Sequence, residues 1–219
     1  MNTFLGHGSY VYGVCLSPDA KLVFSASSDR SCRMWEVTQS ETTQVLKSAT
    51  FWKSVGFLDD CVVDVTDIHQ CGEIEVASTT CIRTFLGHSS WVRKCCISKD
   101  VEHLFSSSGD KTVKMWKAQT GECIRTFEGH TGAVYRICLS NSNGQQWLFS
   151  GSGDKTVKIW NVITGACVAT LHAHTEWIGG LCITNDDSRL FTASRDQTVK
   201  MWCNNYQFSL GSLSFSKIK

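Results

Sequence analysis

Histidine, serine and aspartate residues recur in this 219-residue sequence at spacings that suggest catalysis. His88, Ser106 and Asp110 could act as general base, nucleophile and orienting carboxylate, which is the usual arrangement for acyl transfer. Such a set occurs four times, however, and each set ends in a tryptophan. Four copies without a recognisable oxyanion element argue against a single active site. The four sets are His7, Ser25, Asp29 and Trp35; His88, Ser106, Asp110 and Trp116; His130, Ser150, Asp154 and Trp160; and His174, Thr192, Asp196 and Trp202.

A glycine-rich run, "GSGDKTVKIW" at 151–160, could instead form a phosphate-binding loop. Such a loop needs a glycine directly before the Lys-Thr pair and a helix after it. Here Asp154 separates Gly153 from Lys155, which places a carboxylate where phosphate charge would lie, and the β-branched residues that follow favour a strand. Similar runs occur at three other places in the chain. The run therefore indicates repeated architecture rather than a phosphate site.

The charges of the chain nearly cancel, with 21 Lys plus Arg against 20 Asp plus Glu. No global field would draw in nucleic acid or an anionic membrane. The first residues lack the basic and apolar pattern of a signal peptide, and no apolar run approaches the roughly 18 residues that span a bilayer. We therefore expect an intracellular protein, cytoplasmic or nuclear, without a membrane partner.

Six of the twelve cysteines recur at regular offsets from a histidine or a tryptophan. Equivalent positions in neighbouring packed sheets lie about 10 Å apart, whereas a disulfide needs Cα atoms closer than about 7 Å. We therefore interpret these cysteines as small buried hydrophobes. No C-x-x-C pair suggests zinc, and neither a metal nor a cofactor is expected. The regularly spaced cysteines are Cys15, Cys96, Cys138 and Cys182, each eight residues after a histidine, and Cys123 and Cys167, each seven after a tryptophan.

An internal repeat is the strongest signal in the chain. A Gly-His or Ala-His pair begins each set, and the tryptophan follows the histidine at offsets of 28, 28, 30 and 28 residues. His88 to His130 is 42 residues and His130 to His174 is 44. His7 to His88 is 81, which corresponds to two units.

The repeat resembles the WD40 repeat, a unit of about 40 to 45 residues with Gly-His near its start and Trp near its end. The resemblance extends from Thr3 to Trp202, although none of the four tryptophans is followed by the family's aspartate. It implies an all-β β-propeller of about five four-stranded blades, the second of them degenerate. The blades would form either a closed five-bladed ring or a portion of a larger propeller.

The resemblance also implies boundaries for the repeats. Residues 1–203 are expected to form the propeller domain, and 204–219 a tail that is either a closing strand or disordered. The second unit is degenerate because Ser48 and Ile74 stand where its histidine and tryptophan should be. The expected units are 3–43, 44–84, 85–126, 127–170 and 171–203, and the strands of the third unit, from the innermost outwards, are 91–98, 103–108, 112–118 and 122–127.

In WD40 proteins the residues that match the four sets form a structural chain. The Trp indole binds the Ser or Thr hydroxyl, the hydroxyl binds the His, and the His binds the Asp. A hydroxyl committed to both neighbours is not free to attack, so the resemblance implies that the chain is not an enzyme. A second serine on the same strand face leaves an alternative for the hydroxyl in each set. These alternatives are Ser27, Ser108, Ser152 and Ser194.

The resemblance further implies a binding face at the start of the innermost strands. Side chains three and five residues after each histidine point at the partner in the family, together with the residue before each aspartate. Exposed aromatics with arginine match the composition of binding hot spots. Trp91 and Trp177 could alternatively pack sideways against the next blade. The candidate residues are Tyr10, Tyr12, Trp91, Arg93, Tyr135, Trp177 and Arg195.

The expected function is that of a non-catalytic scaffold or adaptor that binds a peptide or protein on this face. The alternative is a phosphopeptide or nucleic-acid reader, such as a substrate receptor of a ubiquitin ligase or an RNA-processing factor, because Arg93, Arg195 and Lys53 could meet phosphates.

Overall fold

The computed structural model describes residues 4–38, 78–140, 147–172, 174–204 and 215–217. These residues form four four-stranded antiparallel sheets and, within the same ranges, no helix. It follows that the described part of the chain contains no helix long and apolar enough to cross a membrane. The all-β fold expected from the sequence is therefore confirmed.

Each sheet takes its strands from the chain in order, from the innermost to the outermost. The first sheet comprises β1 (Val11–Leu16), β2 (Leu22–Ser27), β3 (Ser31–Thr38) and β4 (Ser78–Leu86). The second comprises β5 (Val92–Ile97), β6 (His103–Ser108), β7 (Val113–Lys117) and β8 (Cys123–Phe127). The third comprises β9 (Val134–Leu139), β10 (Trp147–Ser152), β11 (Val157–Asn161) and β12 (Cys167–Leu171). The fourth comprises β13 (Ile178–Ile183), β14 (Arg189–Ser194), β15 (Val199–Asn204) and β16 (Phe215–Lys217).

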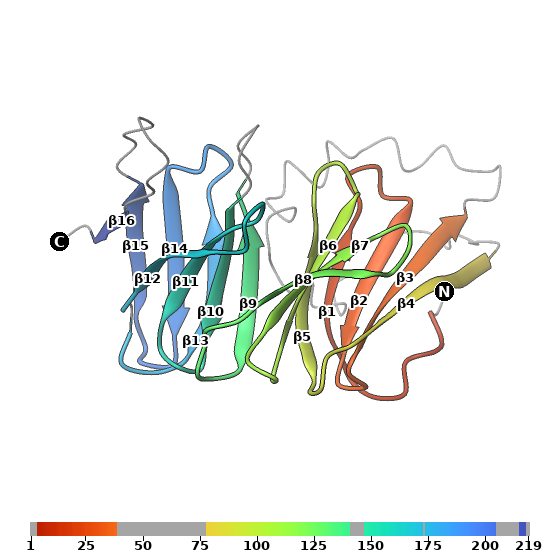
Figure 1. Cartoon of the computed structure of the whole chain (residues 1–219), viewed down its shortest axis with the longest axis horizontal. Coiled ribbons are helices and arrows are strands. Elements are labelled where there is room, and N and C mark those ends of the chain that lie inside the picture. Colours follow the sequence, from red (N-terminus) through yellow and green to blue (C-terminus); the bar gives the residue numbers. More distant parts are fainter. Residues whose placement is uncertain (1–3, 39–77, 141–146, 173, 205–214, 218–219) are drawn as a thin grey trace, which may run out of the picture.

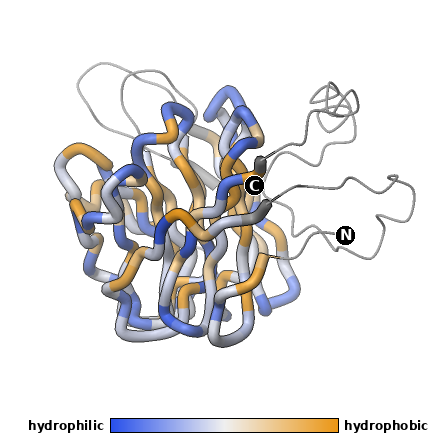
Figure 2. The backbone as a smooth tube through the Cα atoms, turned by 90° about the vertical axis from the view of Figure 1, so that its right-hand side faces the viewer, coloured by the Kyte–Doolittle hydropathy of each residue, from blue (hydrophilic) through white to orange (hydrophobic). Residues whose placement is uncertain are grey.

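The four sheets stand in a row, and their innermost strands lie side by side. β1 neighbours β5, β5 neighbours β9, and β9 neighbours β13, so that the first and fourth sheets form the two ends of the row (Figure 1). The strands carry most of the hydrophobic stretches, and the turns at both ends of the sheets carry hydrophilic ones (Figure 2). This arrangement is that of neighbouring propeller blades.

The core lies between the sheets rather than within one of them. At the first junction, Cys32 and Phe85 of the first sheet pack with Val92 and Cys95 of the second. Corresponding apolar clusters fill the junctions between the second and third sheets and between the third and fourth. Because both faces of an inner sheet are buried, its middle strands are apolar without strict alternation.

The turn between the second and third strand of every sheet is built around one aspartate. In the second sheet, Asp110 Oδ1 accepts hydrogen bonds from the backbone N–H and the hydroxyl of Thr112, at 3.0 and 2.7 Å. Lys111 between them has a φ of 72°, in the left-handed region that few side chains adopt. Arg30, Lys155 and Gln197 repeat this conformation in the other sheets. The turn thereby fixes one carboxylate oxygen and leaves the other to face the histidine.

One repeat boundary expected from the sequence is corrected by the strand pairing. Residues 78–84, expected at the end of the second unit, lie in β4, which pairs with β3 and completes the first sheet. Trp35 is opposite Cys81 in this pair, just as Trp116 is opposite Cys123 in the second sheet. Residues 39–77, which include Ser48 and Ile74, lie outside the described residues. In the tail, β16 forms the outermost strand of the fourth sheet.

Candidate functional site

Each of the four residue sets forms one hydrogen-bonded chain inside its own sheet. In the second sheet the Trp116 indole N–H donates to Ser106 Oγ at 2.7 Å. Ser106 Oγ lies 2.8 Å from His88 Nε2, and His88 Nδ1 lies 2.7 Å from Asp110 Oδ2. The other three sets repeat these contacts, with Trp35, Ser25, His7 and Asp29 in the first sheet, Trp160, Ser150, His130 and Asp154 in the third, and Trp202, Thr192, His174 and Asp196 in the fourth.

In these contacts the serine or threonine hydroxyl both accepts and donates a hydrogen bond. The Ser106 oxygen accepts the indole hydrogen, so its own hydrogen is directed at Nε2 when Nδ1–H donates to the carboxylate. Ser106 and Trp116 are fully buried, and no substrate can approach that oxygen. The arrangement is a structural network that satisfies buried polar groups rather than a nucleophile beside its base.

The serines two residues after each network hydroxyl do not join the networks and make other hydrogen bonds. Ser108 Oγ accepts the backbone N–H of Asp110 at 3.1 Å and donates to the carbonyl oxygen of Ser90 at 3.1 Å. These two contacts bind the aspartate turn to the start of the inner strand. Ser27, Ser152 and Ser194 make the equivalent pair of contacts in the other sheets.

The aspartates of the networks stay ionised to unusually low pH. Burial of Asp110 opposes its charge, but hydrogen bonds from His88 and Thr112 and the charge interaction with His88 outweigh it and hold the pKa well below its ordinary value. The pKa values of Asp29, Asp154 and Asp196 are lowered in the same way, against the cost of burial. The aspartate carboxylate at the end of each network therefore keeps its negative charge in the folded protein.

A second cluster lies at the end of the sheets where the innermost strands begin, which we call the top face. Arg93 lies at its centre, with its guanidinium carbon 4.7 Å from the ring centroid of Tyr12, 4.9 Å from that of Trp91 and 5.5 Å from that of Tyr135. All three distances are within the range of cation–π attraction. One arginine thus joins side chains from three neighbouring sheets.

The cluster continues onto the fourth sheet through Trp177. The Tyr135 and Trp177 ring centroids are 5.1 Å apart, and the Arg195 guanidinium carbon lies 5.2 Å from the Trp177 ring. The result is a continuous row of side chains across all four sheets, which we call the aromatic–arginine ladder. It consists of Tyr12, Trp91, Arg93, Tyr135, Trp177 and Arg195.

β-Bulges explain why these side chains gather at the top face. Tyr12, Arg93 and Tyr135 are each the extra residue of a bulge at the start of an inner strand. A bulge bends the strand and redirects one side chain out of the regular alternation. Gly179 occupies the corresponding bulge in the fourth sheet, where a Cβ would meet nothing within 4 Å. The ladder therefore has one open position, next to Trp177.

Of the seven residues proposed from the sequence for the binding face, six lie in the ladder. Tyr10 precedes β1 and is exposed, and no ring contact joins it to the ladder among the described residues. Trp91 is 50% exposed, whereas Trp116 of the network is 1% exposed. Trp177 is half-buried and packs against Tyr135 of the neighbouring sheet. The tryptophans of the ladder thus contact aromatic side chains of a neighbouring sheet and also remain partly exposed to solvent.

Arg93 is the polar centre of the ladder and lacks an anionic partner in the described part of the chain. Its Nε–H is buried and donates to no hydrogen-bond partner there, and its guanidinium carbon lies over the rings of three aromatic side chains.

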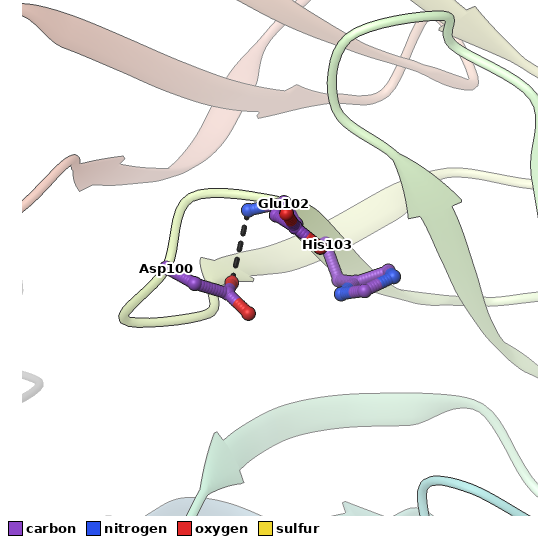
Figure 3. A group of neighbouring side chains, drawn as sticks. All are labelled: Asp100, Glu102 and His103. Carbon is purple, nitrogen blue, oxygen red and sulfur yellow. Dashed lines mark hydrogen bonds between the residues drawn. The ribbon is translucent and has the colours of Figure 1, made fainter.

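A group of three possible metal ligands, Asp100 and Glu102 in the turn before β6 and His103 at the first residue of β6, lies at the opposite end of the sheet (Figure 3). Asp100 Oδ1 there accepts hydrogen bonds from the Ser98 hydroxyl and from the Glu102 backbone N–H, the latter at 2.9 Å. Asp19 and Asp186 make the same contacts in the matching turns of the first and fourth sheets. The carboxylate of Asp100 is thus part of a repeated turn, and the group is no more than this turn beside an exposed glutamate and a histidine.

Of the six regularly spaced cysteines expected to be buried, only Cys138 is buried, and Cys15, Cys96 and Cys182 are half-buried. Cys123 and Cys167, expected to be buried, are exposed, because they lie on the outermost strands at the positions opposite Trp116 and Trp160. Cys15 and Cys95, from neighbouring inner strands, bring their sulfur atoms to 3.7 Å. All ten described cysteines are free thiols.

Comparison with known sequences agrees with the fold. The sequence profile described as "WD domain, G-beta repeat" matches residues 1–36, 79–117, 121–161 and 165–203. The chain is 28% identical over 131 residues to the serine-threonine kinase receptor-associated protein of Gallus gallus, covering 55% of this chain and 35% of that protein. It is 35% identical over 155 residues to nuclear distribution protein PAC1-2 of Uncinocarpus reesii, covering 55% and 32%. With apoptotic protease-activating factor 1 of Danio rerio it shares 29% identity over 168 residues, covering 53% and 13%. The matches thus span about a third or less of these relatives.

The family profile matches four segments of the chain, and the described residues form four sheets, each with one polar network. The chain therefore belongs to the WD40 repeat family.

Proposed function

We propose that this chain is a non-catalytic interaction scaffold that binds a protein or peptide across its top face. The aromatic–arginine ladder carries the proposal, because it is a row of half-exposed aromatics and arginines that the polar networks do not use. Tryptophan, tyrosine and arginine are the residues most enriched in binding hot spots. WD40 proteins generally act as interaction scaffolds, and one relative is named for its association with a kinase receptor.

Two further observations support a scaffold over an enzyme. The four Ser-His-Asp sets are buried structural networks, so the residues with nucleophilic chemistry are engaged inside the sheets. The free thiols fit the proposal of a reducing, intracellular location, either cytoplasmic or nuclear.

Affinity capture from the source cells with quantitative mass spectrometry tests this proposal. The bait is the full chain, and the test variant is Arg93→Ala combined with Trp177→Ala. Lys117→Ala, an exposed side chain at the end of β7 away from the top face, is the matched control. We expect the partners retained by the parent and by the control to be lost from the double variant. Retention of the same partners by all three baits would refute the top face as the binding surface.

A phosphopeptide or nucleic-acid reader is the second candidate, and the uncompensated charge of Arg93 favours it. Binding that depends on phosphate weakens steeply as salt rises, because exposed charges are screened within about 8 Å at physiological ionic strength. Capture repeated at low and high salt separates the two. A partner held mainly by aromatic contacts stays bound, and a phosphate-bearing partner is released.

A further inference from the structure

Two cysteine thiols from neighbouring sheets lie next to each other at the first junction. Cys15 Sγ of β1 is 3.7 Å from Cys95 Sγ of β5, and both residues are free thiols. They lie 80 positions apart in the sequence, and neither belongs to a polar network or to the aromatic–arginine ladder. The fold therefore brings together two nucleophilic sulfur atoms that the proposed binding face does not use.

The backbones of the two strands approach closely at this point. A Cβ built on Gly13 would lie 3.2 Å from Lys94 Cα and 3.7 Å from Cys95 N. Gly13 and Cys15 share one face of β1, because side chains alternate along a strand and the bulge of β1 comes before Gly13. Packed sheets are normally about 10 Å apart, whereas β1 and β5 are in direct contact here. This approach fits the requirement that the Cα atoms of a disulfide lie closer than about 7 Å.

The three junctions between the sheets differ in what the inward-facing cysteine meets. At the second junction Cys96 packs against the cluster that contains Ile137, and at the third Cys138 and Leu181 share one cluster. Ile137 and Leu181 follow the histidine of their own sheet by seven residues, as Cys95 does. Aliphatic side chains thus fill the Cys95 position at the other two junctions, so packing alone does not require a thiol there.

The two thiols differ in burial. Cys95 is fully buried and donates to the carbonyl oxygen of Phe24 at 3.5 Å. Cys15 is half-buried. A small oxidant therefore reaches the sulfur of Cys15 first, with the sulfur of Cys95 beside it.

We propose that Cys15 and Cys95 form an oxidation site, at which hydrogen peroxide converts the two thiols into a disulfide that joins the first and second sheets. The Cys15 thiolate attacks one peroxide oxygen, the O–O bond breaks, and the products are a sulfenic acid and, after protonation of the leaving hydroxide, water. The Cys95 thiol then attacks the sulfenic sulfur, the S–S bond forms, and the S–O bond breaks to release a second water that carries the Cys95 proton. The two sulfur atoms together lose the two electrons that the peroxide gains. In a reducing compartment the pair stays as thiols, and the bridge forms only under oxidising conditions.

The bridge would constrain both the unfolded chain and the folded one. It closes a long loop in the sequence, which restricts the unfolded state. It also ties together the two strands that carry Tyr12 and Arg93, whose ring centroid and guanidinium carbon are 4.7 Å apart. Tyr12 lies three residues before Cys15, and Arg93 lies two before Cys95.

Peptide mapping of the purified full chain tests the proposal. The reduced protein is treated with a small excess of hydrogen peroxide, unfolded in iodoacetamide to block the remaining thiols, and digested without reductant. We expect a peptide pair linked through Cys15 and Cys95 that is absent before oxidation and separates on reduction. Sulfinic acid at Cys15 without a linked pair would overturn the proposal, and so would a link from Cys95 to Cys32, the other cysteine of the same cluster.

Thermal unfolding of matched variants gives a second, independent measurement. The oxidised parent should melt about 5 to 10 °C above the reduced parent, since the bridge constrains the unfolded chain. Cys15→Ala and Cys95→Val should show no shift on oxidation, and both should fold, because aliphatic residues hold the Cys95 position at the other junctions. An equal shift in Cys95→Val would contradict the proposed pair.

Cys32→Val is the control, because Val113 and Val157 hold the position of Cys32 in the second and third sheets, three residues after the network aspartate. This variant should keep both the linked peptide pair and the rise in melting temperature. Loss of the bridge in Cys32→Val would assign the oxidation to Cys32 and contradict the pairing of Cys15 with Cys95.

Discussion

Arg93 of the second sheet and Tyr135 of the third stand at equivalent β-bulges, and the guanidinium carbon of one lies 5.5 Å from the ring centroid of the other. This contact joins the two halves of the ladder, because Tyr12 and Trp91 surround Arg93 on one side and Trp177 packs on Tyr135 on the other. Side chains that lie 42 residues apart in the repeat thereby form one surface.

Trp91 and Trp177 should matter for binding far more than for stability. Truncation of a hot-spot aromatic costs about 2 kcal/mol or more, which is roughly a thirtyfold loss of affinity. We expect Trp91→Ala and Trp177→Ala each to lose partner capture by about that factor while the melting temperature changes little. Trp116→Ala is the contrasting variant, because loss of a buried Trp costs about 3 to 5 kcal/mol. If Trp91→Ala unfolded the protein as readily as Trp116→Ala, Trp91 would be a core residue.

Ser106 should be worth more to stability than an equally buried serine next to it. Ser106→Ala leaves the Trp116 indole N–H and His88 Nε2 without their partner, and each buried unpaired group costs about 1 to 3 kcal/mol. Ser107→Ala removes only one 3.5 Å contact, to the carbonyl oxygen of Lys94, and is the matched control. Chemical denaturation measures both.

Ser106→Thr should restore most of the stability lost in Ser106→Ala, since Thr192 makes the same contacts in the fourth sheet. An equal loss of stability for Ser106→Ala and Ser107→Ala would show that the network contributes little.

The second repeat illustrates what periodicity cannot distinguish. The 81-residue spacing between His7 and His88 fits two units, but it fits equally well one unit with an insertion between its third and fourth strands. Only the register of β4 against β3 assigns residues 78–86 to the first sheet. By contrast, the strands of the third expected unit lie within one residue of their predicted positions, because its turns and apolar runs are sharply marked.

For the candidate site, too, the sequence identifies the residues but not how they lie relative to one another. Offsets from the histidine identify the aromatic and arginine positions, yet no residue type marks a bulge, so the contact of Arg93 with three rings is not visible in the sequence. The exposure of Cys123 and Cys167 was missed for a related reason. A position opposite a buried tryptophan faces solvent when its strand is the outermost of the sheet.

Acidification should weaken the fold through the network aspartates. The pKa of Asp110 in the folded protein lies below the value of about 3.9 for an unfolded aspartate. The unfolded state therefore binds more protons between these values, and the stabilisation present above about pH 5 is lost as the pH falls through the folded pKa. Melting temperatures measured downward from pH 6 should fall steeply.

Asp110→Asn should lower the melting temperature at pH 7 and flatten its fall with acid, so that the two curves converge. Glu122→Gln, an exposed carboxylate in the turn after β7, is the control and should leave the parent's curve unchanged. Parallel curves for Asp110→Asn and the parent would exclude a titrating contribution from Asp110.

The thiols should divide into fast and slow classes on alkylation of the folded protein. Cys81, Cys123 and Cys167 are exposed and should react first, whereas Cys32, Cys95 and Cys138 are buried and should be protected. Peptide mass spectrometry after brief iodoacetamide treatment assigns each site. Uniform labelling of the two classes would contradict the strand positions.

Site-specific photocrosslinking in the source cells tests the binding face most directly. A photoreactive benzoylphenylalanine is placed at Thr131 or Thr175, exposed positions beside the ladder, and in separate chains at Gln119 or Glu122, in the turn at the opposite end of the second sheet. We predict discrete partner adducts from Thr131 and Thr175 that disappear when Arg93→Ala is added, and none from the opposite end. Adducts that form at Gln119 and Glu122 but not at Thr131 and Thr175 would contradict binding at the top face.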